Sequence, residues 1–440
     1  MRMSHTAICL IASVQLLLAE PAIEITTKQL TTTQLQLSWP VQSLVPAGGV
    51  QVFAEYQAES SSDLIDWTPA SERIVGTPFA GKQMSVQVPM QGPGQFLRVH
   101  IILDFTGIDL AGLRANGADF GRATLAGAEM FNCEIRAGRF DGADLRGVSL
   151  QFATLNDSSF REASLVGARM SDAVLKGTDF TGADLSYADL GACDLSNAIF
   201  TGADLRGAIL DLATDSFTDL RNSLTDASTV LTPKLEAIWK IVNTQTKGID
   251  LRGRDMSVAI LTDGYLVGAR AAGVDFSADS LQNARLEGAN LRGANLRFAD
   301  LRGSTIDTKT ILPQKWLTVW QVCNEPTANR VLTNLDLSNS FLVGSSLDGA
   351  DLSGTDLSLA LMFKSSLKRA ELVKADLQSV DLSQSDLTGA NLTSANLGSA
   401  KLNGANLTGA ILRNAVILGA DFTGAIFSNT LMPDGSIRQH

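Results

Sequence analysis

The sequence predicts an all-β protein in which most of the chain winds into a coil of short stacked segments. A large apolar residue recurs at every fifth position over most of the 440 residues. Two related segments interrupt this rhythm with the apolar spacing of a short helix, and the region before it contains short apolar runs typical of strands. The expected order is therefore a small β domain followed by a coil that two helices interrupt.

The first residues predict an export signal. Arg2 precedes the apolar run "AICLIASVQLLLA" (residues 7–19), which is too short for a comfortable transmembrane helix. Leu17 at the −3 position makes cleavage after residue 19 imperfect, and a buried strand is the alternative interpretation. We expect a signal peptide over residues 1–19 and a mature protein that is periplasmic, extracellular or on the cell surface.

Residues 20–104 predict a small β-sandwich. The runs "LQLSW", "VQVFAEYQAES", "MSVQVPM" and "FLRVHIIL" are separated by Gly, Pro and Ser clusters, which favours at least four antiparallel strands. The stretch "YQAESSSDLIDWTP" (56–69) resembles a segment of fibronectin type III or immunoglobulin-like modules. The last of these strands leads directly into the coil, so the domain is expected to cap that end.

The five-residue rule is clearest from Phe105 to Leu210. Of the 22 residues at every fifth position, 21 are Phe, Leu, Met or Ile, and Ala115 is the exception. A small residue usually precedes each of these centres by two positions, a polar residue lies between, and glycine often follows by two. Residues two apart on an extended segment point to the same side, so the small and large residues face inward, and the glycine provides a bend.

The rhythm resumes twice, which predicts three blocks over residues 105–225, 249–306 and 335–431. The blocks contain 53 pentads, including "LEGANLRGANLRFADLRG" and "LTGANLTSANLGSAKLNGANLTGAILRNA". This pattern resembles the pentapeptide-repeat family, written A(D/N)LxG. The resemblance implies four pentads per turn of a right-handed quadrilateral parallel β-helix, with about thirteen turns over ~60 Å.

Some positions depart from the rule. Arg254 and Asp279 occupy the small inward slot and Ala271 occupies a centre, so we expect local distortion in the second block. Cys133 and Cys193 replace alanine in the inward slot of one face, three turns and ~14 Å apart, which is too far for a disulfide. Their expected role is packing.

Two insertions, at residues 226–248 and 307–334, share a motif. "TVLTPKLEAIWKIVN" (229–243) aligns without gaps with "TILPQKWLTVWQVCN" (310–324), and both place apolar residues at i, i+3, i+4 and i+7. Each therefore predicts a short amphipathic helix. Trp239 and Trp320 are the candidate interaction residues: they either pack on the coil or anchor a partner.

No pattern in the sequence predicts a catalytic, metal or cofactor site. The three His and four Cys are scattered, so we expect no metal site and no cofactor, and no catalytic triad or phosphate loop is visible. Asp336, Asp356 and Asp376 recur at intervals of twenty because the repeat itself requires Asp or Asn there. The protein is therefore not expected to be an enzyme. Residues 432–440, "MPDGSIRQH", predict a C-terminal cap.

Two functions remain open. The first is an exported structural or protein-interaction protein with the coil as spacer or binding surface, and with an unknown protein or cell-surface partner. The second, which the family resemblance implies, is an acidic DNA mimic that inhibits a topoisomerase such as gyrase, like the quinolone-resistance members. The net charge of −11 argues against a basic nucleic-acid-binding surface, whereas the export signal and the modest charge density favour the first function.

Overall fold

The computed structural model of the chain describes residues 105–325 and 329–439 with their side chains, and the backbone of the strands between residues 26 and 104. It forms two compact units, residues 1–232 and 233–440, and each is described by itself. The predicted signal peptide, residues 1–19, lies outside the described residues.

The N-terminal strands form two antiparallel sheets. β1, β2 and β6 pair in that order, and β4, β5 and β7 each pair with β3. The strands are β1 (Thr26–Thr31), β2 (Gln34–Pro40), β3 (Phe53–Ser61), β4 (Thr68–Pro69), β5 (Ile74–Gly76), β6 (Gln83–Pro89) and β7 (Phe96–Asp104). The four predicted runs all overlap strands. The face-to-face packing of a β-sandwich would involve side chains outside the described residues, so the β-sandwich stays a prediction.

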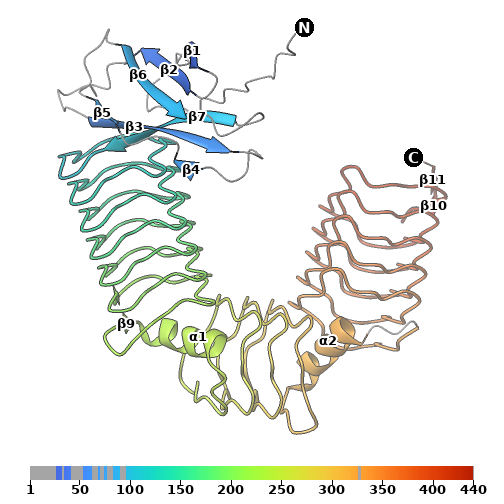
Figure 1. Cartoon of the computed structure of the whole chain (residues 1–440). Coiled ribbons are helices and arrows are strands. Elements are labelled where there is room, and N and C mark those ends of the chain that lie inside the picture. The colour runs from blue at the N-terminus through green and yellow to red at the C-terminus, as the bar shows by residue number, and fades with distance from the viewer. Residues whose placement is uncertain are drawn as a thin grey trace. The chain divides into compact units, whose positions relative to one another are not determined.

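From Phe105 onward the backbone repeats a five-residue unit that consists of a turn and one bridging residue (Figure 1). Each bridging residue pairs in parallel with the residue twenty positions later, as Asp109 does with Glu129 and Glu129 with Ser149. Four pentads therefore complete one turn of the coil. Consecutive outward residues, such as Asp179 and Asp184, lie in different ladders and diverge around it.

The centres form the core. Phe120, Phe140, Phe160, Phe180 and Phe200 are fully buried, and their rings stack with centroids 4.5–5.2 Å apart and planes within 19° of parallel. This column exists because residues twenty apart occupy the same place in successive turns. Stacking of this kind adds to the hydrophobic stabilisation of the coil.

The bend position is left-handed whether or not glycine occupies it. Gly107 has φ 63°, and the same slot holds Phe152 at φ 59° and Leu212 at φ 56°. A side chain in this region costs about 1–2 kcal/mol relative to the right-handed region. Glycine is therefore favoured at the bend but not required, because the ladders on both sides hold the turn.

The two helices lie where the sequence predicts them: α1 (Pro233–Asn243) and α2 (Gln314–Asn324). Pro233 is the first residue of α1, whereas Pro313 is the N-cap of α2. The predicted apolar stripes are confirmed at their first two members and half-buried at their last two: Leu235, Ile238, Trp239 and Val242 in α1, and Trp316, Val319, Trp320 and Cys323 in α2. The helices bury Leu235, Ala237, Ile238 and Ile241 in α1 and Trp316, Thr318, Val319 and Val322 in α2. The face against the coil is rotated from the expected one, which leaves the second tryptophan position at the edge of the contact.

The expected distortion at Arg254 and Asp279 is absent from the bridge ladder. The bridges there keep the spacing of twenty, as between Asp255 and Asp275. The irregularity instead precedes each helix: β8 (Ile209–Leu210) pairs with β9 (Val230–Leu231) at a spacing of twenty-one, as Asn290 does with Ile311. One extra residue at each place lets the chain leave the coil.

The C-terminal residues form a hairpin of β10 (Thr430–Leu431) and β11 (Ile437–Arg438). The Arg438 guanidinium lies 3.8 Å from the centroid of the buried Phe427 ring. The hairpin therefore covers the last core residue, which is what a cap does, and it begins two residues before the predicted boundary at 432.

Candidate functional site

The two predicted interaction residues are half-buried. Trp320 donates a hydrogen bond from Nε1 to the Ser304 carbonyl at 3.0 Å, and Trp239 occupies the aligned position of α1. One helical turn before Trp320 in α2, Trp316 is buried, and the Lys315 amine lies 5.1 Å from its ring centroid. A half-buried indole whose N–H is bonded to the coil fits a packing role, and neither tryptophan presents a fully accessible aromatic face.

Two phenylalanines that the sequence analysis did not single out are more exposed. Phe131 and Phe152 are 45% and 50% exposed, and their rings meet edge to face with centroids 5.4 Å apart. They occupy the same corner of the coil in successive turns. The available signal was their position: both lie one or two places after a centre, where the repeat mostly has glycine or polar residues.

Other exposed apolar residues lie on the same face of the first block. Leu212 is 80% exposed on the corner of Phe152, three turns further along, and Tyr187 is 68% exposed on the opposite corner of that face. Between these corners, Ile209 is also exposed. We call these residues the apolar face: Phe131, Phe152, Tyr187, Ile209 and Leu212.

Charged residues also lie on the apolar face, because Glu129, Arg169 and Asp189 belong to the same bridge ladder as Ile209. Glu129 pairs with Arg169 at 3.1 Å, and both side chains are about half exposed. Asp172, Asp189 and Asp211 recur along the same side of successive turns. The face therefore combines aromatic and aliphatic side chains with an excess of carboxylates.

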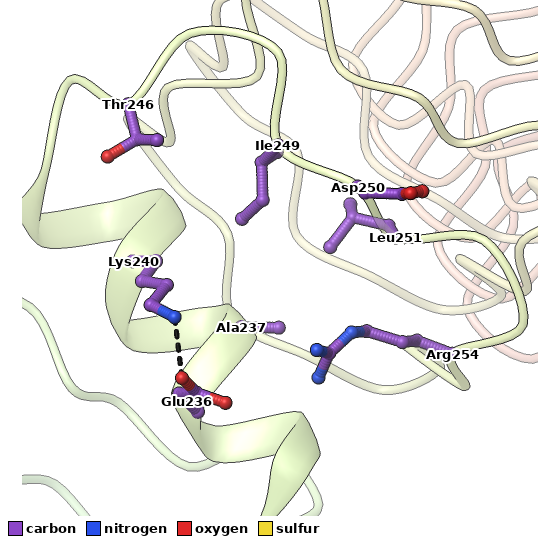
Figure 2. Close-up of a pocket in the computed structure, with 8 residues that line it drawn as sticks. All are labelled: Glu236, Ala237, Lys240, Thr246, Ile249, Asp250, Leu251 and Arg254. Atoms are coloured by element: carbon purple, nitrogen blue, oxygen red, sulfur yellow. Dashed lines mark hydrogen bonds and ion pairs between the residues drawn. The ribbon is translucent and has the colours of Figure 1, made fainter.

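A cavity of about 260 Å³ lies between α1 and the first pentads of the second block (Figure 2). Its charged groups already have partners: Lys240 pairs with Glu236 at 2.5 Å, and Arg254 donates to the Pro233 carbonyl at 2.6 Å. Figure 2 shows the Arg254 side chain extending toward α1. The cavity is slightly smaller than ordinary ligand pockets, which begin near ~300 Å³, and it contains no nucleophile paired with a base.

Asp250 lines this cavity as well. Hydrogen bonds and charge from Arg252, together with the charge of Arg270, hold the pKa of Asp250 well below its usual range. The carboxylate is therefore ionised and paired, which suits surface structure and does not suit proton transfer.

The three cysteine thiols in the part of the chain that the structure describes are unreactive. Burial raises the pKa of Cys133, Cys193 and Cys323 to about 12, so each is a protonated thiol at neutral pH. Cys133 and Cys193 are buried and unpaired, as the packing role predicts. Within residues 105–325 and 329–439, no three His, Cys, Asp or Glu side chains converge as metal ligands would.

The column of aspartates is a ladder of the repeat. Asp336 bridges Asp356, which bridges Asp376. Asp336 accepts a hydrogen bond from Lys315 at 2.7 Å, and Asp376 accepts one from the Asn396 amide at 3.0 Å. These contacts tie Asp336 to α2 and Asp376 to the next turn of the coil.

A coil of stacked pentads with apolar centres defines a solenoid of the pentapeptide-repeat class. The family model described as pentapeptide repeats matches eight copies, over residues 139–177, 173–211, 272–306, 331–362, 364–389 and 390–429. The chain belongs to the pentapeptide-repeat proteins.

Several solved structures are similar to this chain. A pentapeptide-repeat protein from the cyanobacterium Nostoc is 34% identical over 22% of this chain and 80% of its own, with a TM-score of 0.20. HetL, a Nostoc protein involved in heterocyst differentiation regulation, is 22% identical over 76% of this chain and 93% of its own, with a TM-score of 0.17. QnrB1, a plasmid-mediated fluoroquinolone resistance protein, is 18% identical over 46% of this chain and 86% of its own, with a TM-score of 0.22. No curated protein sequence matches the chain.

No helix in the described part of the chain is long and apolar enough to cross a membrane.

Proposed function

We propose that this protein is an exported, non-enzymatic interaction protein whose first block binds a partner protein through the apolar face. Its coil is inferred to be right-handed and quadrilateral, and it serves as a stiff scaffold for that face. The partner presents apolar side chains surrounded by basic ones. The exposed edge-to-face pair of Phe131 and Phe152 is the observation that carries this proposal.

Exposed aromatic pairs are better explained by binding than by folding. Phe152 occupies a left-handed bend, where a side chain is unfavourable, and half of its surface is in contact with solvent. Truncating it would remove little core packing. Aromatic side chains at the centre of an interface contribute disproportionately to affinity, typically ~2 kcal/mol or more each when they are buried by a partner.

The acidic excess of the first block favours a basic partner. The first block, residues 105–225, contains 17 acidic and 10 basic residues. Asp172 lies one turn beyond Phe152 on the same corner, and Asp189 and Asp211 follow in the next two turns. A partner with Lys or Arg around an apolar protrusion would be complementary, which raises the rate of association and disfavours acidic partners.

The same charges weigh against a DNA mimic. The second block, residues 249–306, contains seven acidic and seven basic residues, so the acidic character is not continuous along the coil. Several carboxylates are also neutralised by an arginine two residues later, as in the pairs Asp144–Arg146 and Asp204–Arg206. A duplex carries one uncompensated charge every ~1.7 Å, which this surface does not imitate.

Binding is tested with a double variant, Phe131→Ser with Phe152→Ser. The full-length protein and its variants are used to capture interacting proteins from envelope fractions of the native organism. The matched control is Ile199→Ser, because Ile199 is also exposed but lies in a different ladder, on the opposite side of the coil. Retention by the wild type and the control with loss in the double variant supports the proposal, whereas equal retention by all three contradicts it.

Two further experiments test whether the protein is exported and whether it inhibits a topoisomerase. Fractionation with N-terminal sequencing of the mature chain should find it outside the cytoplasm and shortened by about the predicted 19 residues. The purified protein should leave gyrase supercoiling unchanged. A cytoplasmic chain that inhibits supercoiling would reverse the ranking of the two functions.

A further inference from the structure

Most polar residues in the small inward slot follow a common hydrogen-bond rule, whereas Ser223, Ser304 and Ser340 donate to the carbonyl of the centre three residues earlier. Ser158 Oγ accepts from the backbone N–H of Gly138 at 3.0 Å and donates to the Ile135 carbonyl at 2.8 Å. These partners lie 20 and 23 residues earlier, one turn back in the coil. The hydroxyl therefore inserts into the turn of the preceding layer, accepting from its N–H and donating to its carbonyl.

Ser385 follows the same rule in the third block. Its Oγ accepts from the Ser365 N–H at 3.1 Å and donates to the Met362 carbonyl at 2.8 Å. Thr178, which donates to the Leu155 carbonyl 23 residues earlier, keeps the donating half of the pattern. A polar side chain in this slot, where alanine is usual, therefore contributes a group that donates to that carbonyl.

Asp279 occupies this slot in the second block. Its side chain is only 1% exposed, and Oδ1 accepts from the Ala259 N–H, twenty residues earlier, at 2.8 Å. In an ordinary pentad this N–H donates to the carbonyl of its own centre, as Ala284 does to Leu281. Asp279 takes the Ala259 N–H away from the Met256 carbonyl, and its Oδ2 is buried without a hydrogen-bond partner.

We propose that Asp279 is a pH-sensitive switch in the second block: as a neutral carboxylic acid it donates from Oδ2 to the Met256 carbonyl, and its ionisation opens the turn at residues 256–259. Position 256 is 23 residues before 279, the place of the accepting carbonyl for Ser158 and Ser385. A protonated carboxyl has one acceptor oxygen and one O–H, so it matches both halves of the rule. An ionised carboxylate has no proton to donate and would leave a charge buried among apolar centres.

The charged surroundings support the neutral form. Burial raises the pKa of Asp279 well above its ordinary value, and the negative charges of Asp275 and Asp255 act in the same direction. The Ala259 N–H and the positive charge of Lys234 on α1 oppose them but do not prevail. The Lys234 amine donates to the Ser257 carbonyl at 2.7 Å, which occupies it beside the same turn. In the following turn, Asp300 pairs with Arg302.

The sign of the pH dependence follows from the raised pKa. The folded state holds the proton more tightly than the unfolded state, in which an aspartate titrates near ~3.9. The stabilisation from the neutral acid is complete below that value and is lost as the pH rises toward the folded-state pKa of Asp279. Over this window the equilibrium constant for opening increases about tenfold per pH unit, and above the folded-state pKa it levels off.

The test is hydrogen exchange of the full-length protein between pH 5 and pH 8, corrected for intrinsic exchange rates and analysed for peptides that contain Ala259. The main variant is Asp279→Asn, which keeps an acceptor and a donor but cannot ionise. The matched control is Asp255→Asn: it removes an exposed acid whose charge adds to the raised pKa of Asp279 but leaves the Asp279 carboxyl in its slot, so the pH dependence should persist. Asp279→Ser, which reproduces Ser158, is the second variant in case the amide does not fold.

We expect opening to increase with pH in the wild type and in Asp255→Asn, and to be independent of pH in Asp279→Asn or Asp279→Ser. Infrared spectra should also show the carbonyl stretch of a protonated carboxyl in the wild type at neutral pH, and this band should be missing from Asp279→Asn. Equal pH dependence in the wild type and both Asp279 variants would overturn the proposal, as would loss of the dependence in Asp255→Asn.

Discussion

The stacked phenylalanines of the first block allow a sharp prediction about stability. Phe160 lies in the middle of the column, fully buried, with ring centroids 4.5 Å from Phe140 and 5.2 Å from Phe180. Replacing Phe160 with Ala should lower the free energy of unfolding by about 4–5 kcal/mol, the upper part of the range for such truncations.

The expected cost of Phe160→Ala is high because the backbone around the missing ring cannot close in. The backbone N–H of Phe140 donates to the Ser159 carbonyl and that of Phe160 to the Asp179 carbonyl, both at 2.7 Å, so each turn is held at its place in the ladder. The cavity left by the ring therefore remains, and two aromatic contacts worth about 0.5–1.5 kcal/mol each are lost with it.

The assay is urea unfolding of the full-length protein, followed by circular dichroism, with Phe152→Ala as the matched control. Phe152 belongs to the same block but is half exposed and has one aromatic contact, with Phe131, so its truncation should cost about 1 kcal/mol or less. A cost below ~1 kcal/mol for Phe160→Ala, or equal costs for both variants, would refute the stacked core.

Three further outcomes are expected. Gly409→Ala should destabilise the second unit by about 1 kcal/mol through its left-handed φ of 67° alone, because nothing lies within 4 Å of the new Cβ. Gly398→Ala has no left-handed φ, and the closest atom to its new Cβ is Asn396 Oδ1 at 3.2 Å, which a small side-chain shift relieves, so it should cost less in the same urea assay. Burial acts to raise the pKa of Asp219, but hydrogen bonds and charge from Arg221 outweigh it and leave that pKa below its ordinary value. The contribution of Asp219 is therefore present above pH ~4 and is lost as the pH falls through its folded-state pKa, so Asp219→Asn should reduce acid sensitivity in thermal melts. Trp320→Phe should cost about 1 kcal/mol in thermal or urea unfolding by removing the Nε1 hydrogen bond while keeping ring packing, and no loss would argue against that bond.

Much of the fold could be predicted from the sequence because the repeat is local. Each centre, such as Leu185 or Leu190, has its small inward neighbour two positions before it, and every turn copies the previous one. The two helices were predictable for the same reason, since their motif occurs twice. The rotation of their buried faces was not, because it depends on the surface of the coil against which Leu235 and Trp316 pack.

The candidate site was predictable only in part. Trp239 and Trp320 could be chosen from the sequence as rare large aromatic residues, but their half-burial depends on the assembled coil. Phe131 and Phe152 lie twenty-one residues apart, and only the closure of four pentads per turn brings their rings into contact.

The sequence by itself determined that this chain is a solenoid of pentads, because a period of five places the central apolar residue of each pentad on the inside of a closed coil. The tertiary structure alone decided which side chains meet across turns. The hydrogen bond from the Ala259 N–H to Asp279 and the contact between Phe131 and Phe152 both join residues about twenty positions apart, which only the stacking of turns brings together.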